Sequence, residues 1–414
     1  MDITQVRLWN RNFTILTVGS FISAFGSAAA GIAFGILVYK NTGSPMILAF
    51  FTIANIIPRI ITNFVIGPFI DRHSRRNIIV AIDYFYGFLF LALGFILYSG
   101  YFNVLLFTFV AAFLGVIDTT YQTAFMSLYP EVISEGYHSK AYSISSLIWP
   151  ISAAVMAPVA AFFIENYGNG VALLMFFNAI TFFITASIEL LIKVDEKLNQ
   201  NLVKGPQFIA DLREGIHYYK KERGILGIGI LFAAFSFVYA ASDLLRMPYF
   251  VSSEIYTIQH FSFLISASAI GRMVGGIIHY AFKYPKEKKF LIAVTVYITV
   301  EILSATMLFY PIYALMIVAS FIVGLLSVTS FNIRMSATQT YIPNAIRGRV
   351  NSTQQLMWNF GAILGALITG IAAEYAGIDY RFIILASSVV SLSAVLLIPI
   401  RMKNEFKRIY NVDV

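Results

Sequence analysis

The stretch GPFIDRHSRRN, residues 67–77, interrupts an almost wholly apolar part of the chain with a compact, mostly basic turn. The run before it, 44–66, carries Arg59 as its only charge, and the run after it, 78–98, carries only Asp83. Apolar runs of this length are typical of helices that cross a membrane. The turn therefore predicts a polar connection between two spanning helices.

The composition of the whole chain indicates a membrane protein. Charged residues make up 12% of the 414 residues and hydrophobic residues 58%, whereas soluble domains carry about 25% charged residues. The absence of cysteine excludes disulfides, thiolate metal sites and cysteine nucleophiles. The net charge of +8 is compatible with a membrane surface as well as with nucleic acid, and the positions of the basic residues decide between them.

Twelve apolar runs are long enough to span a bilayer, which requires about twenty residues. They cover approximately residues 12–39, 44–70, 77–99, 102–128, 140–164, 170–192, 224–250, 258–282, 290–309, 312–338, 346–373 and 381–400.

The lysines and arginines orient these spans. If the N-terminus is cytoplasmic, the outer loops hold only Lys40 and Arg381 of the 29 basic residues. Four arginines lie within spans, and all the other basic residues fall on the cytoplasmic side. The positive-inside rule therefore predicts an all-α membrane protein with both termini in the cytoplasm and no nucleic-acid partner.

The two halves of the sequence resemble each other. Residues 149–168 align without a gap with 358–377, and residues 58–77 align with 271–290. An even number of spans per half gives both halves the same orientation, so we expect two parallel six-helix repeats. Such repeats around a central site are an architecture of transporters.

The predicted domains follow from the repeat and from the longest polar stretch. We expect an N-terminal six-helix bundle at 1–192, a cytoplasmic linker at 193–223 and a C-terminal six-helix bundle at 224–414. Apolar residues at helical spacing in the second part of the linker predict an interfacial amphipathic helix.

The opening stretch resembles a signature of the major facilitator superfamily, G-x-L-x-D-R-x-G-R-R/K, between the second and third spans. Gly67, Asp71, Arg72, Arg75 and Arg76 stand at the matching positions, while Phe and Ser replace the Leu and the second Gly. The resemblance covers essentially the whole chain and implies the major facilitator fold. It also implies that the stretch is a conformational-switch motif, and we expect Asp71 to bind the N-terminal end of span eleven when the cytoplasmic side is closed.

Span five resembles that of drug–proton antiporters in this superfamily, which carry a small-residue run ending in G-P-x-x-G. Here Ala157 and Pro158 occupy the Gly-Pro positions. Pro58-Arg59 entering span two and the turn at 343–349 are similar to bacterial macrolide exporters. The sequence departs from many exporters in span four, which lacks the arginine of their R-x3-G motif, so a coupling mechanism based on that arginine does not carry over.

Charges inside the predicted spans are expensive in hydrocarbon and require a partner, water or a function. The resemblance implies that spans one, four, seven and ten line the cavity. Asp118 on span four and Asp243 on span seven are therefore candidates for proton coupling, with Arg334 and Arg246 as ion-pair partners. The alternative is that Asp118–Arg334 and Asp243–Arg246 are static pairs that fix the helices.

The remaining candidates serve packing or substrate contact. Arg59 and Arg272 are mates in the repeat, so we expect a gate or packing role for them, together with Ala157 and Pro158. Apolar drugs bind through area and aromatic stacking, and helix packing is the alternative role for such side chains. The candidates for the substrate cavity are Phe25, Tyr121, Gln122, Phe235, Tyr239 and Asn332.

These observations predict a secondary active transporter that exports amphipathic, macrolide-like or multiple drugs by alternating access, driven by proton antiport. An exporter of an endogenous metabolite, such as a siderophore or lysolipid, is the alternative. A membrane-embedded enzyme is disfavoured because no HExxH, G-x-S-x-G or Walker A pattern is present. We expect a monomer in a bacterial plasma membrane, with an amphipathic small molecule, protons and lipid as partners and with no cofactor or metal.

Overall fold

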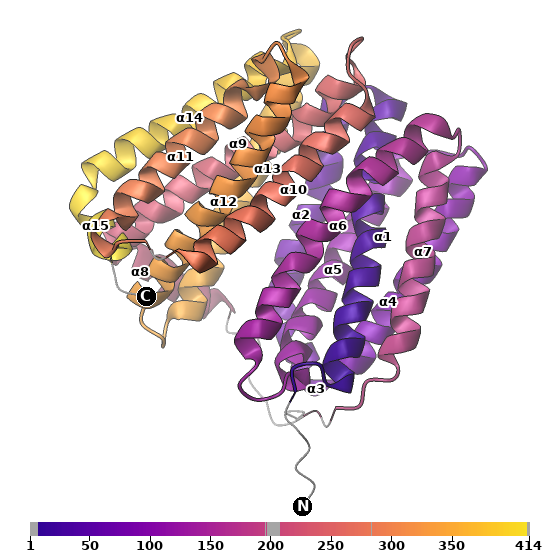
Figure 1. The fold of residues 1–414 in the computed structure, drawn as a ribbon, viewed down its shortest axis with the longest axis horizontal. Helices are drawn as coiled ribbons and strands as arrows, with labels where there is room; N and C mark the ends of the chain where they lie inside the picture. Colours follow the sequence, from indigo (N-terminus) through magenta and orange to yellow (C-terminus); the bar gives the residue numbers. More distant parts are fainter. Residues whose placement is uncertain (1–6, 195, 197–207, 283, 412–414) are drawn as a thin grey trace, which may run out of the picture. The chain divides into compact units, whose positions relative to one another are not determined.

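The computed structural model describes residues 7–194, 196, 208–282 and 284–411. Over these residues the secondary structure is helical, with turns and no strand (Figure 1). Twelve helices in this part of the chain are long and apolar enough to cross a membrane. In lipid a helix satisfies its own backbone hydrogen bonds, which is why apolar runs of this length fold in this way. The prediction of twelve spans is confirmed.

The long helices of the first half match the first six predicted spans. They are α1 (Arg11–Thr42), α2 (Pro45–Val65), α4 (Arg75–Tyr98), α5 (Val104–Val132), α6 (His138–Asn166) and α7 (Gly170–Glu189).

The long helices of the second half match the other six. They are α9 (Arg223–Val251), α10 (Ile258–Ala281), α11 (Lys289–Thr306), α12 (Tyr313–Tyr341), α13 (Arg347–Tyr375) and α14 (Tyr380–Arg401).

Shorter helices complete the described chain. They are α3 (Gly67–Arg72), α8 (Phe208–Lys221) and α15 (Lys403–Tyr410), with the 3-10 turns η1 (Lys286–Lys288) and η2 (Met307–Phe309).

The second predicted span is shorter than expected. It was predicted to reach residue 70, but α2 ends at Val65, and the separate helix α3 begins at Gly67. Pro68 stands in the first turn of α3, where its missing backbone N–H costs nothing, whereas the same proline inside a continuous helix would remove a hydrogen bond. The opening stretch is therefore a short helix followed by the start of α4.

The chain forms two compact units. Met1–Asn41 with Ala54–Pro206 make unit 1, and Thr42–Ile53 with Gln207–Val414 make unit 2. In unit 1, α4 and α7 pack along each other, and in unit 2 the corresponding helices of the repeat, α11 and α14, do the same. The sequence boundaries 1–192, 193–223 and 224–414 stay a prediction.

The linker ends in helix α8, which is fixed to α13 within unit 2. Glu214 of α8 accepts a 2.6 Å salt bridge from Arg349 of α13. A side chain at Gly215 would come within 2.7 Å of the Arg349 carbonyl oxygen, so only glycine permits this contact. Burial among the neighbouring helices raises the pKa of the Tyr219 hydroxyl. A position of α8 at the membrane interface remains a prediction.

Glycines set the closest approaches between long helices. Gly271 and Gly275 of α10 lie against the backbone of α12, and Gly361 and Gly365 of α13 lie against the backbone of α9. Small residues allow this approach in membranes, where van der Waals contact contributes much of the helix association. Gly31 of α1, by contrast, has no neighbouring atom within 4 Å of the position that a Cβ would take.

We expect Gly365→Ala to lower stability by about 1–3 kcal/mol, because the added Cβ would overlap the Phe237 carbonyl oxygen and push α13 from α9. Gly31→Ala is the matched control. It should be neutral or gain up to about 1 kcal/mol from helix propensity. Thermal unfolding of the detergent-solubilised variants measures both. Equal unfolding temperatures for the two variants would show that the α9–α13 contact does not require glycine.

Candidate functional site

A group of polar side chains from three helices of unit 1 surrounds Asp118. The Tyr86 hydroxyl of α4 donates a hydrogen bond to the Asp118 Oδ1 atom of α5. Arg59 of α2 supplies a positive charge that acts on Asp118. Asp118 and Arg59 were predicted from the sequence, whereas Tyr86 was not, because nothing in a single sequence shows which faces of α4 and α5 meet.

A close contact between α2 and α5 positions Arg59. A Cβ on Gly115 would overlap the Asn55 carbonyl oxygen and lie 3.1 Å from the Arg59 Cγ atom. The Asn55 side-chain amide also donates to the Ala111 carbonyl oxygen at 2.9 Å. Gly115 lies three residues before Asp118, so the same approach of the two helices brings the guanidinium toward the carboxylate.

A second polar group lies in unit 2 around Asp243 of α9. Asp243 is exposed, and Arg246 and Arg272 both act on its charge. The charge of Arg272 on α10 also acts on the Tyr239 hydroxyl. Arg246 donates to the Ser304 carbonyl oxygen at 3.3 Å, so this arginine fixes α9 to α11 in addition to facing the acid.

Arg334 lies in an aromatic environment within unit 2. Its guanidinium carbon is 3.9 Å from the centre of the Phe232 ring and 5.4 Å from that of Phe331. This stacking stabilises a cation that is almost fully buried. The Phe235 ring packs on Phe232 with a centroid distance of 5.2 Å, which supports the packing role weighed for it. Asp118 belongs to the other unit, and its pairing with Arg334 stays a prediction.

The candidate cavity residues divide between the units. Phe25, Tyr121 and Gln122 belong to unit 1, and Phe235, Tyr239 and Asn332 belong to unit 2. Gln122 and Tyr239 are exposed, with 55% of the Tyr239 surface open, and the other four are half-buried. A cavity that contains all six remains a prediction.

The two span-five candidates lie inside α6 and do not end it. Ala157 is fully buried and Pro158 is half-buried. Proline removes one backbone donor from the helix, and small neighbours make such a position tolerable. Their predicted role at a gate is untested, while the burial of Ala157 agrees with packing.

The basic residues of the opening stretch bind other helices of unit 1. Arg75 forms a salt bridge with Glu131 at the end of α5, and Arg76 donates to the Leu190 carbonyl oxygen after α7. The stretch therefore ties together the ends of three helices. Asp71 and Arg72 lie in α3, where Asp71 is half-buried and Arg72 is exposed.

Glu196, at the start of the linker, caps the N-terminus of α4. Its carboxylate accepts hydrogen bonds from the Ser74 hydroxyl at 2.7 Å, the Arg75 backbone N–H at 2.5 Å and the Arg76 backbone N–H at 3.1 Å. Ser74 is the N-cap residue and accepts from the Asn77 N–H. An anion is favourable at this end of a helix. Serine is a favoured N-cap residue, whereas no local signal in the sequence points to Glu196.

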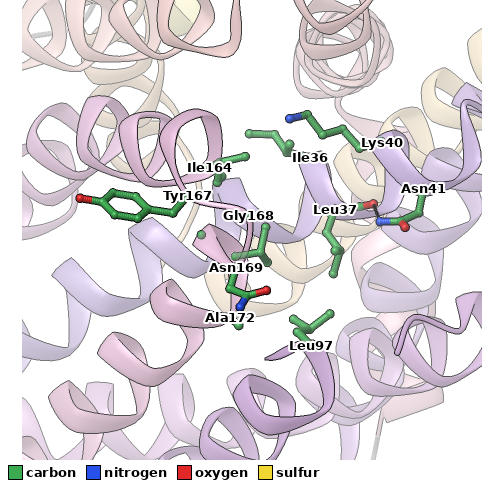
Figure 2. A pocket seen from close by; sticks show the side chains of 12 residues that line it. Ile36, Leu37, Lys40, Asn41, Leu97, Ile164, Tyr167, Gly168, Asn169 and Ala172 are labelled. Carbon is green, nitrogen blue, oxygen red and sulfur yellow. Dashed lines mark hydrogen bonds between the residues drawn. The ribbon is translucent and has the colours of Figure 1, made fainter. Parts of the chain in front are cut away.

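A pocket of about 200 Å³ lies where α1, α4 and α6 end and α7 begins (Figure 2). None of the candidate residues lines it. The Asn41 amide donates within α1 to the Leu37 carbonyl oxygen at 2.8 Å. Figure 2 shows the Tyr167 ring pointing away from the other lining side chains. The lining residues are Ile36, Leu37, Lys40, Asn41, Leu97, Ile164, Tyr167, Gly168, Asn169, Gly170, Val171 and Ala172.

Comparisons with known proteins agree on one family. Residues 16–343 match the family model described as Major Facilitator Superfamily. Macrolide efflux protein A of Streptococcus pyogenes is 22% identical over 397 residues, which cover 94% of this chain and 95% of that protein. An uncharacterised MFS-type transporter of Bacillus subtilis, YkuC, is 22% identical over 92% of this chain and 90% of its own.

Solved structures show the same fold. A bacterial homologue of the iron transporter ferroportin in an inward-facing state has a TM-score of 0.69 at 15% identity, with 96% of this chain and 98% of that chain covered. The nucleoside transporter NupG has a TM-score of 0.68 at 16% identity, with 94% and 99% covered. At these identities the likeness concerns the fold alone.

We expect Glu196→Ala to destabilise unit 1 by about 1 kcal/mol, because the first N–H groups of α4 lose their acceptor. Glu135→Ala, at an exposed acid between α5 and α6, is the matched control and should leave stability unchanged. Thermal unfolding in detergent compares the two. If Glu196→Ala unfolds at the wild-type temperature, the carboxylate contributes no net stability as a cap.

Proposed function

Because the chain belongs to the major facilitator superfamily, we propose that it is a secondary active transporter that exports amphipathic drugs of the macrolide type by proton antiport. We place it as a monomer in the plasma membrane of a bacterium, with both termini in the cytoplasm. Its substrate is a small molecule, and it works in a lipid bilayer. The family and the structural neighbours indicate a transporter rather than an enzyme.

One observation carries the choice of substrate class. The similarity to Macrolide efflux protein A extends over 94% of this chain and so includes both six-helix halves. A drug of this class is large and amphipathic, and aromatic side chains bind the apolar surface of such molecules through contact area. The exposed Tyr239 and Gln122 are suitable contacts for such a substrate.

The acids within the spans support the choice of proton coupling. Asp118 has a neutral donor, Tyr86, and a cation, Arg59, as neighbours. Asp243 is exposed next to two arginines. An ionised carboxylate in a spanning helix is costly unless it is paired. A carboxyl group that loses its proton as its arginine approaches, and regains it as the arginine leaves, would couple proton entry to drug exit.

We expect expression of the chain to lower the accumulation of erythromycin, a macrolide, in bacterial cells that lack their own exporters. A protonophore should restore accumulation, since it removes the proton gradient. Radiolabelled erythromycin measured with and without the protonophore tests both parts. Equal accumulation in expressing and non-expressing cells would contradict export of this class. Export that persists with the protonophore would contradict proton coupling.

Asp118→Asn and Asp243→Asn should each reduce this export to background while the protein still folds and binds erythromycin, because an amide keeps the shape of the carboxyl group and cannot titrate. Glu254→Gln, at an exposed acid between α9 and α10, is the matched control and should export normally. Binding to purified protein and export from cells are measured in parallel. Normal export by both aspartate variants would exclude these residues as proton carriers.

A further inference from the structure

Two acids that the proposed mechanism does not use are fully buried against each other in unit 1. Asp83 of α4 and Glu189, the last residue of α7, each have 0% of their surface exposed. They lie within hydrogen-bonding reach of each other. With both groups ionised, none of their four carboxylate oxygens has a hydrogen-bond partner among the described residues.

The walls of this site come from four helices. Gly19 of α1 is so close that a Cβ there would lie 3.1 Å from the Glu189 Oε1 atom. The Thr185 hydroxyl of α7 donates to the Gly19 carbonyl oxygen at 3.1 Å and so is not aimed at the acids. The titratable groups that face the pair are two tyrosines, Tyr86 on α4 and Tyr121 on α5, whose hydroxyls interact electrostatically with it.

No basic side chain in the described part of the chain is hydrogen-bonded to either carboxylate. Arg76 lies on the same helix as Asp83, but its guanidinium donates to the carbonyl oxygen of Leu190, the residue after Glu189. Burying a carboxylate without a cation or donor costs several kcal/mol, and two adjacent anions repel each other as well. A proton shared between the two carboxyl groups would remove one of the two charges and would supply the missing hydrogen bond.

In the equivalent helix pair of the second repeat, a buried acid has both a hydrogen-bond donor and a cation as partners. Glu301 of α11 is also buried, but it accepts a 2.5 Å hydrogen bond from the Ser391 hydroxyl of α14, and Arg246 acts on its charge. Glu301 thus has a donor and a cation, whereas Asp83 and Glu189 have only each other. The missing partners distinguish the pair from an ordinary structural carboxylate.

Tyr86 connects the pair to Asp118. It lies three residues after Asp83 on α4, so both residues occupy the same helix face, and its hydroxyl is hydrogen-bonded to Asp118. Tyr86 therefore lies between Asp118 on one side, to which it donates, and the acid pair on the other, whose Asp83 acts on it electrostatically.

We propose that Asp83 and Glu189 form a second proton-binding site of the transport cycle, where one shared proton is released and regained. Release breaks the O–H bond of one carboxyl group, the proton passes to water, and two anions remain. These anions repel each other, so the deprotonated pair favours an arrangement in which α4 and α7 separate or admit water, and reprotonation favours the packed arrangement. This inference rests on the proposed function, since transport provides the cycle.

Infrared difference spectroscopy on the purified full chain tests the proton itself. The wild type should show a protonated-carboxyl band at neutral pH, where ordinary Asp and Glu are ionised. The double variant, Asp83→Asn with Glu189→Gln, should remove the part of this band that comes from the pair. The control Glu254→Gln should leave the band unchanged. The single variants Asp83→Asn and Glu189→Gln are the controls for folding. In each, the new amide can donate a hydrogen bond to the remaining carboxylate. An identical band in wild type and double variant would overturn the proposal.

Transport in liposomes tests whether the proton moves. With erythromycin as the probe, the double variant should lose uptake driven by a pH gradient to the level of protein-free liposomes. It should keep exchange of labelled for unlabelled erythromycin, which requires no net proton movement. Wild-type uptake on the pH gradient would make the pair structural, and a loss confined to uptake driven by a sodium gradient would make it a sodium site. Either result overturns the proposal.

A wild-type protein that neither accumulates nor exchanges erythromycin contradicts the proposed function instead. The infrared band still decides the proton-binding site in that case, because the spectrum does not depend on a substrate.

Discussion

Close backbone contact at glycines holds several of the long helices together. Helices in lipid gain little from burying apolar surface against each other, so their association depends on close packing. Glycines provide that packing at α10–α12, at α9–α13 and, through Gly115, at α2–α5. The last of these brings Arg59 toward Asp118. The position of Arg59 next to Asp118 in unit 1 therefore depends on a glycine, which has no side chain to keep the two helices apart.

The charged groups of the spans follow one rule with one exception. Arg334 is stacked on aromatic rings, Arg246 donates to a backbone carbonyl, and Glu301 accepts from a hydroxyl. Each has a partner that reduces the cost of burial. The exception is the pair Asp83 and Glu189, whose carboxylate oxygens have no hydrogen-bond partner among the described residues.

The sequence was sufficient to predict the spans and the family, because length, apolarity and the basic turns are local properties. It selected Asp118 and Asp243 for the same reason, since a charge in an apolar run is visible without a structure. It failed where the answer depends on which helix faces meet. Tyr86 resembles the many other aromatic residues of its span, and Glu189 looks like a residue at the water boundary.

The Glu196 cap on α4 limits where the chain can be divided into two separately expressed halves. Residue 196 lies beyond the last helix of the first half, yet it completes the beginning of the third spanning helix. Two half-proteins meant to be expressed separately and recombined should therefore be divided after Glu196, not at the end of α7. A reporter domain inserted into the linker should respect the same limit.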